Sequence, residues 1–136
     1  MPQKIPTSQT QPVYTDLDPS MTRNPKTNDW LSLKDSRSIK SSLQNLFSTS
    51  YGERLFQPQI GNSLRSLLFE PIDSITTFEV RDRILETIRK YEPRISNVIV
   101  DVVANPNQNQ YEITVEYTIQ ALGAADKVTT VLERIR

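Results

Sequence analysis

The fold is decided by residues 76–103, Thr76-Thr-Phe-Glu-Val-Arg-Asp-Arg-Ile-Leu-Glu-Thr-Ile-Arg-Lys-Tyr-Glu-Pro-Arg-Ile-Ser-Asn-Val-Ile-Val-Asp-Val-Val103. The first half predicts a helix, because its apolar residues recur at helical spacing and form one stripe. These residues are Val80, Ile84, Leu85, Ile88 and Tyr91. Thr76, followed three positions later by Glu79, is typical of a capping box, so the helix is expected to begin at Thr76.

The helix is predicted to end at Tyr91, before a corner made of Glu92, Pro93 and Arg94. Pro93 lacks a backbone N–H and pushes the preceding residue out of the helical region. After the corner, residues 95–103 read as a strand with apolar residues on both faces, which is typical of a strand covered on both sides. The corner is therefore expected to be a rigid bend between two packed elements.

A helix is also predicted at about residues 37–50, with Asp35 or Ser36 as its cap. Its buried face is expected to consist of Ile39, Leu43, Leu46 and Phe47. The loop that follows this helix is expected to point Leu55 and Phe56 inward.

A shorter helix follows that loop, and Asn62 or Ser63 is expected to cap it. Glu70-Pro71 ends this helix for the reason given for Glu92-Pro93. Its apolar residues are Leu64, Leu67, Leu68 and Phe69.

Strands dominate the rest of the chain. Residues 111–119 alternate strictly between apolar and polar, which predicts a strand with one buried face. With the preceding strand they form a β-hairpin around a polar loop at residues 105–110. Residues 127–136 match both a helix and a strand, and we predict a strand because Val-Thr-Thr-Val is strand-prone. The predicted class is α+β: a small mixed or antiparallel sheet with a β-hairpin, packed against two or three helices.

An extended N-terminal arm is predicted at residues 1–29, where five prolines interrupt a sequence rich in Gln, Thr, Ser and Asn. Its possible anchors are Tyr14, Leu17 and Met21. Residues 30–136 are expected to form a single domain, since apolar residues become frequent only from Trp30 onward.

Composition excludes several classes of function. The 136 residues contain 16 Lys and Arg and 16 Asp and Glu, so the balanced charge argues against nucleic acid and anionic membrane surfaces as partners. The absence of Cys and His removes the usual nucleophiles, general bases and metal ligands. With no Gly-rich phosphate loop either, no cofactor and no metal are expected.

The enzymatic alternative is a glycoside hydrolase that uses two carboxylates. Its candidates lie near loops or corners and are Glu53, Glu70, Asp73 and Glu92. Carboxylates at such positions are more often caps or ion-pair partners.

The Glu92-Pro93-Arg94 corner also has two interpretations. Glu92 closes the helix and Arg94 pairs with a helix carboxylate such as Glu86, or the rigid bend presents the planar guanidinium of Arg94 to a partner. On the second interpretation, an Arg94→Ala substitution is expected to leave the isolated fold nearly intact. The sheet margin is likewise either blunted by charge or open to a strand from another chain.

Three segments in this order resemble the baseplate wedge protein family of contractile phage tails, the sheath-initiator proteins once described as tail lysozymes. The segments are Tyr51-Gly-Glu-Arg-Leu-Phe-Gln-Pro-Gln-Ile-Gly61, Leu67-Leu-Phe-Glu-Pro71 and Tyr91-Glu-Pro-Arg-Ile95. The resemblance covers roughly residues 16–119 and extends to a component of the type VI secretion baseplate.

The resemblance implies a structural role without catalysis, in a virion tail baseplate assembled in the bacterial cytoplasm with sixfold symmetry. It implies that Glu92, Pro93 and Arg94 bind the helical core bundle of other wedge proteins. It also implies that the sheet accepts strands from the tail sheath subunit, so that the first sheath ring is templated on the baseplate. A peptidoglycan hydrolase remains the alternative function.

Overall fold

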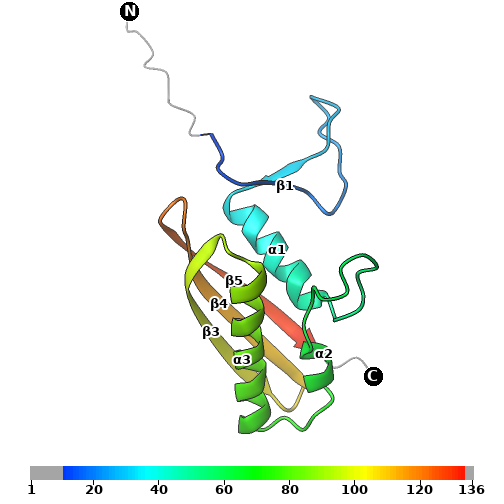
Figure 1. The fold of residues 1–136 in the computed structure, drawn as a ribbon, viewed down its shortest axis with the longest axis vertical. Coiled ribbons are helices and arrows are strands. Elements are labelled where there is room, and N and C mark those ends of the chain that lie inside the picture. The colour runs from blue at the N-terminus through cyan, green and yellow to red at the C-terminus, as the bar shows by residue number, and fades with distance from the viewer. Residues whose placement is uncertain (1–10, 134–136) are drawn as a thin grey trace, which may run out of the picture.

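The computed structural model describes residues 11–133 and has the predicted α+β architecture. Its strands β3, β4 and β5 form an antiparallel sheet in that order, and β1 pairs with β2 outside it (Figure 1). The last three residues of the predicted C-terminal strand, 134–136, lie outside the described residues. The elements are β1 (Thr15–Leu17), β2 (Ser32–Lys34), α1 (Ser36–Ser48), α2 (Leu64–Leu67), α3 (Ser74–Tyr91), β3 (Ile95–Asn105), β4 (Gln110–Ile119) and β5 (Ala124–Glu133).

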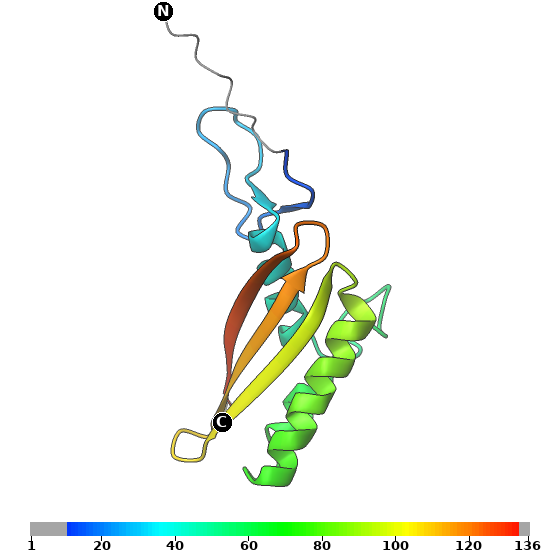
Figure 2. The same ribbon diagram turned by 90° about the vertical axis from the view of Figure 1, so that its left-hand side faces the viewer.

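The core lies between the sheet and its helices. α3 packs against β3 and α1 packs against β5, so both long helices cover the same face of the sheet (Figure 2). The predicted alternation of β4 is confirmed, because its inward side chains are almost fully buried. The buried apolar residues include Ile39, Leu43, Phe47, Val80, Ile84, Ile88, Val100, Tyr111, Ile113, Val115, Tyr117, Ile119 and Val128.

The start of α3 differs from the capping box expected at Thr76. Asp73 is the cap, since its Oδ1 accepts a hydrogen bond from the Thr76 backbone N–H at 2.7 Å. Helix α3 therefore begins two residues earlier, at Ser74, and Thr76 is buried in its first turn. The predicted end at Tyr91 is confirmed, and the Glu92 N–H closes the last turn on the Ile88 carbonyl at 2.9 Å.

The prediction that β3 is covered on both faces is wrong. Val100 is buried against the helices, whereas Ile99 and Val103 on the other face are 60% and 54% exposed. Because α1 and α3 lie on one side of the sheet, no described helix shields the other side. An apolar run predicts a strand but does not reveal how many layers cover it.

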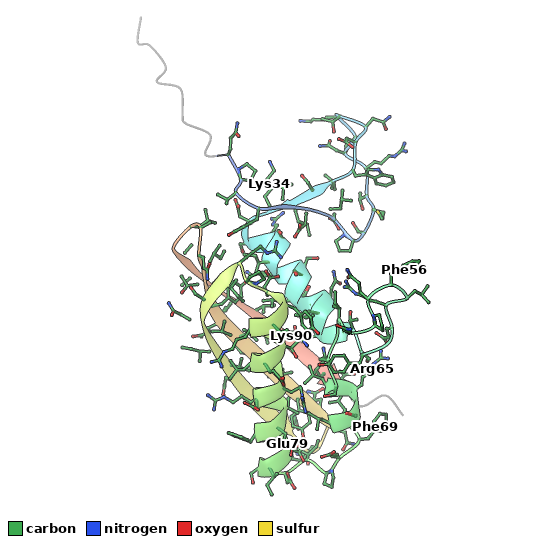
Figure 3. All side chains as sticks on the ribbon, viewed as in Figure 1. Lys34, Phe56, Arg65, Phe69, Glu79 and Lys90 are labelled. Carbon is green, nitrogen blue, oxygen red and sulfur yellow. The ribbon has the colours of Figure 1, made fainter. Side chains whose placement is uncertain are left out.

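The loop before α2 projects away from the domain. Leu55 and Phe56, which were expected to point inward, are 92% and 97% exposed, and Phe56 stands at the outer end of the loop (Figure 3). A backbone bridge between Ser50 and Asn62 draws the ends of the loop together. Gly61 lies so close to Ser50 that a Cβ on it would come within 2.7 Å of the Ser50 carbonyl carbon. The loop therefore closes at its base, and its central residues are held outside the core.

Asn62 joins the end of α1 to the start of α2. Its side-chain Nδ2 donates to the Leu46 carbonyl at 2.7 Å and to the Phe47 carbonyl at 3.2 Å. Its Oδ1 accepts from the Leu64 N–H at 3.0 Å, so of the two predicted caps, Asn62 supplies the acceptor. The amide is 2% exposed, and these bonds satisfy helix-end groups that would otherwise be buried without partners.

Candidate assembly interface

The Glu92-Pro93-Arg94 corner contains a bidentate ion pair between Arg94 and Glu92. Arg94 Nε lies 2.6 Å from Glu92 Oε1, and Arg94 Nη2 lies 2.7 Å from Oε2. Ser42 of α1 donates a third hydrogen bond to Glu92 Oε2 at 2.7 Å. The interpretation in which Arg94 pairs with Glu86 is wrong in this detail, because Glu86 pairs with Arg83 on the surface of α3 at 3.2 Å.

The interactions at the corner favour the ionised forms of both Glu92 and Arg94. Glu92 is only 3% exposed, and burial alone would raise its pKa, but hydrogen bonds from Arg94 and Ser42 outweigh burial and lower the pKa. The hydrogen bonds to Glu92 in turn raise the pKa of Arg94. The carboxylate is thus a buried anion whose stability depends on the neighbouring guanidinium.

The same guanidinium binds the N-terminal segment. Arg94 Nη1 lies 3.1 Å from Asp16 Oδ2, and it also donates to Ser38 Oγ at 3.2 Å. The guanidinium carbon sits 5.6 Å from the centre of the Tyr14 ring, within range of a cation–π contact. Asp16 also accepts a hydrogen bond from Ser38, and the bonds from Ser38 and Arg94 lower the pKa of Asp16 against the opposing effect of burial.

Asp35 fastens the same segment to the domain. It occupies the cap position of α1 but makes no capping hydrogen bond with its side chain. Its Oδ1 instead accepts from the backbone N–H groups of Val13 at 2.9 Å and Tyr14 at 3.0 Å. Of the three predicted anchors, Tyr14 packs against the core, whereas Leu17 and Met21 are exposed. No local pattern in the sequence signals these contacts, since they join residues more than 20 positions apart.

The corner turns one residue outward. Glu92 is buried, Arg94 is partly covered, and Pro93 between them is exposed. Pro93 borders an open cavity of about 450 Å³ whose other walls include Arg89, Asn97 and Gln120. The bend therefore offers a rigid apolar ring beside polar groups, while its charged residues are engaged within the chain.

The two edge strands of the sheet, β3 and β5, differ in how regularly they pair with β4. β3 carries an irregularity between Ser96 and Ile99, where Asn97 takes a left-handed conformation with φ of 49°, and such a bulge interrupts pairing. β5 pairs with β4 without interruption along all ten of its residues, and no described strand lies on its other side. β5 is thus the more regular of the two margins.

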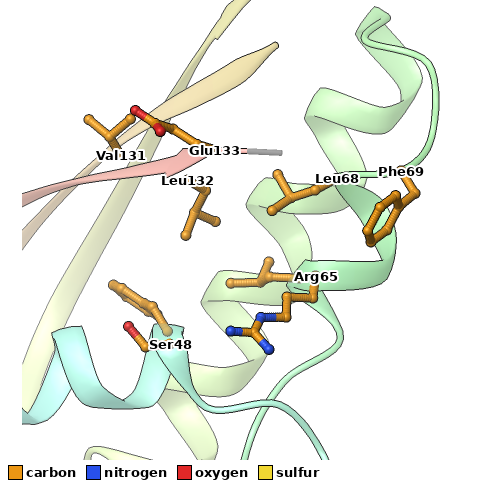
Figure 4. A pocket seen from close by; sticks show the side chains of 9 residues that line it. Ser48, Arg65, Leu68, Phe69, Val131, Leu132 and Glu133 are labelled. Atoms are coloured by element: carbon orange, nitrogen blue, oxygen red, sulfur yellow. The ribbon is translucent and has the colours of Figure 1, made fainter. Parts of the chain in front are cut away.

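An apolar groove of about 360 Å³ adjoins the end of β5. Leu132 points into it, whereas Val131 and Glu133 point to the opposite side of the strand (Figure 4). The walls opposite β5 come from α1, α2 and the turn after α2. They are formed by Phe47, Ser48, Leu64, Arg65, Leu68 and Phe69.

Three of the four candidate hydrolase carboxylates, Glu53, Asp73 and Glu92, make structural contacts. Glu53 pairs with Arg65 at 3.2 Å and accepts from the Ser50 N–H, and Asp73 caps α3. The backbone N–H of Thr76 lowers the pKa of Asp73, and the pKa of Glu92 is lowered as described above. A general acid at neutral pH needs a raised pKa, so the electrostatics of these two carboxylates oppose that role. Glu70 is exposed.

Residues 11–133 contain no group of three or more His, Cys, Asp or Glu residues arranged to hold a metal ion. None of their helices combines the length and apolar character required to span a bilayer.

Comparison with known proteins reveals a consistent family. Residues 34–123 match the family described as Baseplate wedge protein gp25. The chain is 34% identical over 118 residues to Baseplate wedge protein gp25 of Enterobacteria phage T4, covering 85% of this chain and 86% of that protein.

Solved structures share the fold. A putative tail lysozyme from Geobacter sulfurreducens aligns with a TM-score of 0.66 at 21% identity, over 76% of this chain and 96% of that one. A chain of the baseplate complex from the type VI secretion system aligns with a TM-score of 0.61 at 15% identity, over 70% and 89% of the two chains. At these identities the alignments carry information on the fold alone.

Proposed function

Because the chain belongs to the baseplate wedge protein gp25 family, we propose that it links the core bundle of a baseplate wedge to the first ring of sheath subunits in a contractile tail. In this role it templates the sheath by accepting a β-strand from a sheath subunit. The protein acts in the baseplate of the tail, within a sixfold assembly built in the host cytoplasm. It performs no catalysis.

The observation that carries this proposal is the uninterrupted margin of β5 beside an apolar groove. A strand added to β5 gains main-chain hydrogen bonds, which are strong but tolerant of sequence. Its inward side chains would enter the groove next to Leu132, and a one-residue shift would expose them, so the groove selects the register. β3 is a poorer acceptor because of its bulge.

The corner is proposed to bind the wedge core bundle through Glu92, Pro93 and Arg94. Exposed Pro93 would make the direct apolar contact, while the buried Glu92 holds Arg94 in position without further loss of side-chain entropy. Residues 1–29 are proposed to act as the arm of the single domain formed by residues 30–136. The corner and the β5 margin then serve different neighbours.

Cysteine cross-linking tests the sheath contact, since the chain has no native Cys. A Thr129→Cys substitution in β5 would be combined with single cysteines along the terminal segments of the sheath subunit, in assembled particles. Adjacent strands bring paired side chains to about 5 Å, so we expect a disulfide at one register only. The matched control is Asp101→Cys, an exposed site on β3. Sheath cross-links from Asp101→Cys with none from Thr129→Cys would contradict the proposal.

The wedge contact is tested by Pro93→Lys, which places a long charged side chain on the exposed corner. We expect the variant to fold, as monitored by circular dichroism, but to be absent from wedges reconstituted with the other wedge proteins. Glu79→Lys, an exposed site near the start of α3, is the control and is expected to assemble normally. Normal incorporation of Pro93→Lys would show that the corner does not face the wedge.

A further inference from the structure

The face of the sheet opposite the helices is a distinct surface, which we call the outer sheet face. The strand register places residues of all three strands side by side on it. In Figure 2, α3 stands beside the sheet and α1 lies behind it, so the outer sheet face carries no helix of the described chain. Its residues include Ile99, Asp101, Val103, Glu112, Thr114, Glu116, Lys127, Thr129, Val131 and Glu133.

The outer sheet face is acidic although the chain as a whole is neutral. It holds four carboxylates, those of Asp101, Glu112, Glu116 and Glu133, and one ammonium group, that of Lys127. Within residues 11–133 none of these four carboxylates forms an ion pair. Both acids of β4 lie on the middle strand, so the negative charge runs along the centre of the face.

Apolar side chains border this acidic strip. Ile99, Val103 and Val131 are 60%, 54% and 47% exposed. The strand rise separates Ile99 from Val103 by about 13 Å along β3. Val131 faces Glu112 from β5, and Glu112 in turn faces Val103, so the two valines stand about 10 Å apart across the sheet.

We infer that the outer sheet face binds a basic amphipathic helix of another baseplate protein. A helix is about 10 Å wide and fits between the apolar borders on β3 and β5. At 1.5 Å per residue, apolar anchors eight residues apart lie about 12 Å from each other, close to the distance from Ile99 to Val103. Lys and Arg side chains flanking those anchors would reach Asp101, Glu112 and Glu116. A second copy of this chain would bring like charges together, which disfavours self-association through this face.

The surface is independent of the two contacts proposed above. It uses side chains on the face of the strands, whereas the β5 margin offers backbone groups and the corner presents Pro93. An exposed acidic face of this kind also opposes the aggregation of sheets. If the acidic residues serve only to prevent aggregation, the face needs no binding partner. The two explanations differ in whether a basic helix binds here selectively.

Nuclear magnetic resonance of the uniformly ¹⁵N-labelled full chain distinguishes them. The probe is a synthetic 18-residue helical peptide of Leu and Lys, with Leu at positions i, i+3, i+4 and i+7, and the control peptide carries Glu in place of Lys. We expect the Lys peptide to shift amides of residues 99–103, 112–116 and 127–131, and the Glu peptide to shift none. A double variant, Glu112→Lys with Glu116→Lys, is expected to weaken binding at least tenfold.

A matched double variant, Glu79→Lys with Asp82→Lys, makes the same change in net charge on exposed positions of α3 and is expected to bind as the wild type does. Circular dichroism confirms that each variant is folded, and Ile99→Thr with Val103→Thr provides a second, uncharged test with the same expected loss. Equal weakening by both charge variants, shifts spread over the helices, or concentration-dependent self-association through the outer sheet face would overturn the inference.

Discussion

Arg94 Nη1 lies 3.1 Å from Asp16 Oδ2, although 78 positions separate the two residues in the chain. The same guanidinium holds the buried carboxylate of Glu92. The N-terminal segment and the corner therefore share one charged group. A wedge protein that takes up the Arg94 guanidinium must displace Asp16, so binding at the corner is expected to loosen the segment that carries Asp16.

Arg94→Ala is expected to destabilise the isolated protein by about 2 kcal/mol, because it leaves Glu92 buried without its charged hydrogen-bond donor. The ion pair thus changes the expectation, drawn from the sequence, that this variant keeps a nearly intact fold. Urea denaturation measures the loss, and limited proteolysis is expected to cut faster within residues 11–34. Arg83→Ala, which breaks only the exposed pair with Glu86, is the control and should change stability by less than about 0.5 kcal/mol. Equal stability of the two variants would mean that the buried carboxylate of Glu92 costs no stability when the Arg94 guanidinium is removed.

Acid is expected to destabilise the fold through Glu92 and Asp16. Both carboxyl groups have a pKa lower in the folded protein than in the unfolded chain. They therefore add stability above their unfolded pKa of about 4, and this contribution is lost as pH falls through the folded pKa. Urea denaturation from pH 7 to pH 2 should show the decline, and Glu92→Gln should reduce its slope below pH 4. An unchanged slope in Glu92→Gln would assign the acid sensitivity to other groups.

Asn62→Ala is expected to cost about 2–3 kcal/mol, because it removes a buried amide that serves both α1 and α2. The junction also supports Leu64, one wall of the groove beside β5. We therefore expect the variant to lower the yield of the Thr129→Cys cross-link to the sheath as well as the melting temperature. Asn45→Ala, an exposed site on α1, is the control and should leave both unchanged. Wild-type stability of Asn62→Ala would show that water replaces the amide at little cost.

The hydrolase alternative predicts clearing of purified cell walls that depends on particular carboxylates. We expect no clearing by the wild-type protein, since Glu92 and Asp73 both have lowered pKa values unsuited to a general acid. Turbidity of a peptidoglycan suspension is the measurement, with a known lysozyme as the positive control. Clearing by the wild type that is lost in Glu70→Gln, Asp73→Asn or Glu92→Gln would establish catalysis.

Local patterns were enough to predict the order and type of the main elements. The helical stripe around Ile84 and Ile88, the stop at Pro93 and the alternation from Tyr111 to Ile119 all depend on spacing within a single element. Over residues 127–133 the strand predicted from β-branched residues is confirmed, although β5 begins three residues earlier, at Ala124. Such patterns predict individual elements correctly because each one reflects the backbone geometry of a single segment.

Those local patterns could not predict the contacts between segments that are distant in the sequence. Asp35 binds the backbone of Val13 and Tyr14 instead of capping α1, and Arg94 pairs with Glu92 and Asp16 instead of Glu86. Leu55 and the outward side of β3 are exposed, although both read as apolar segments destined for the core. Periodicity identifies which side of an element is apolar, but burial depends on which distant element arrives to cover it. Hydrogen bonds and ion pairs between distant residues are likewise settled only when packing brings the segments together.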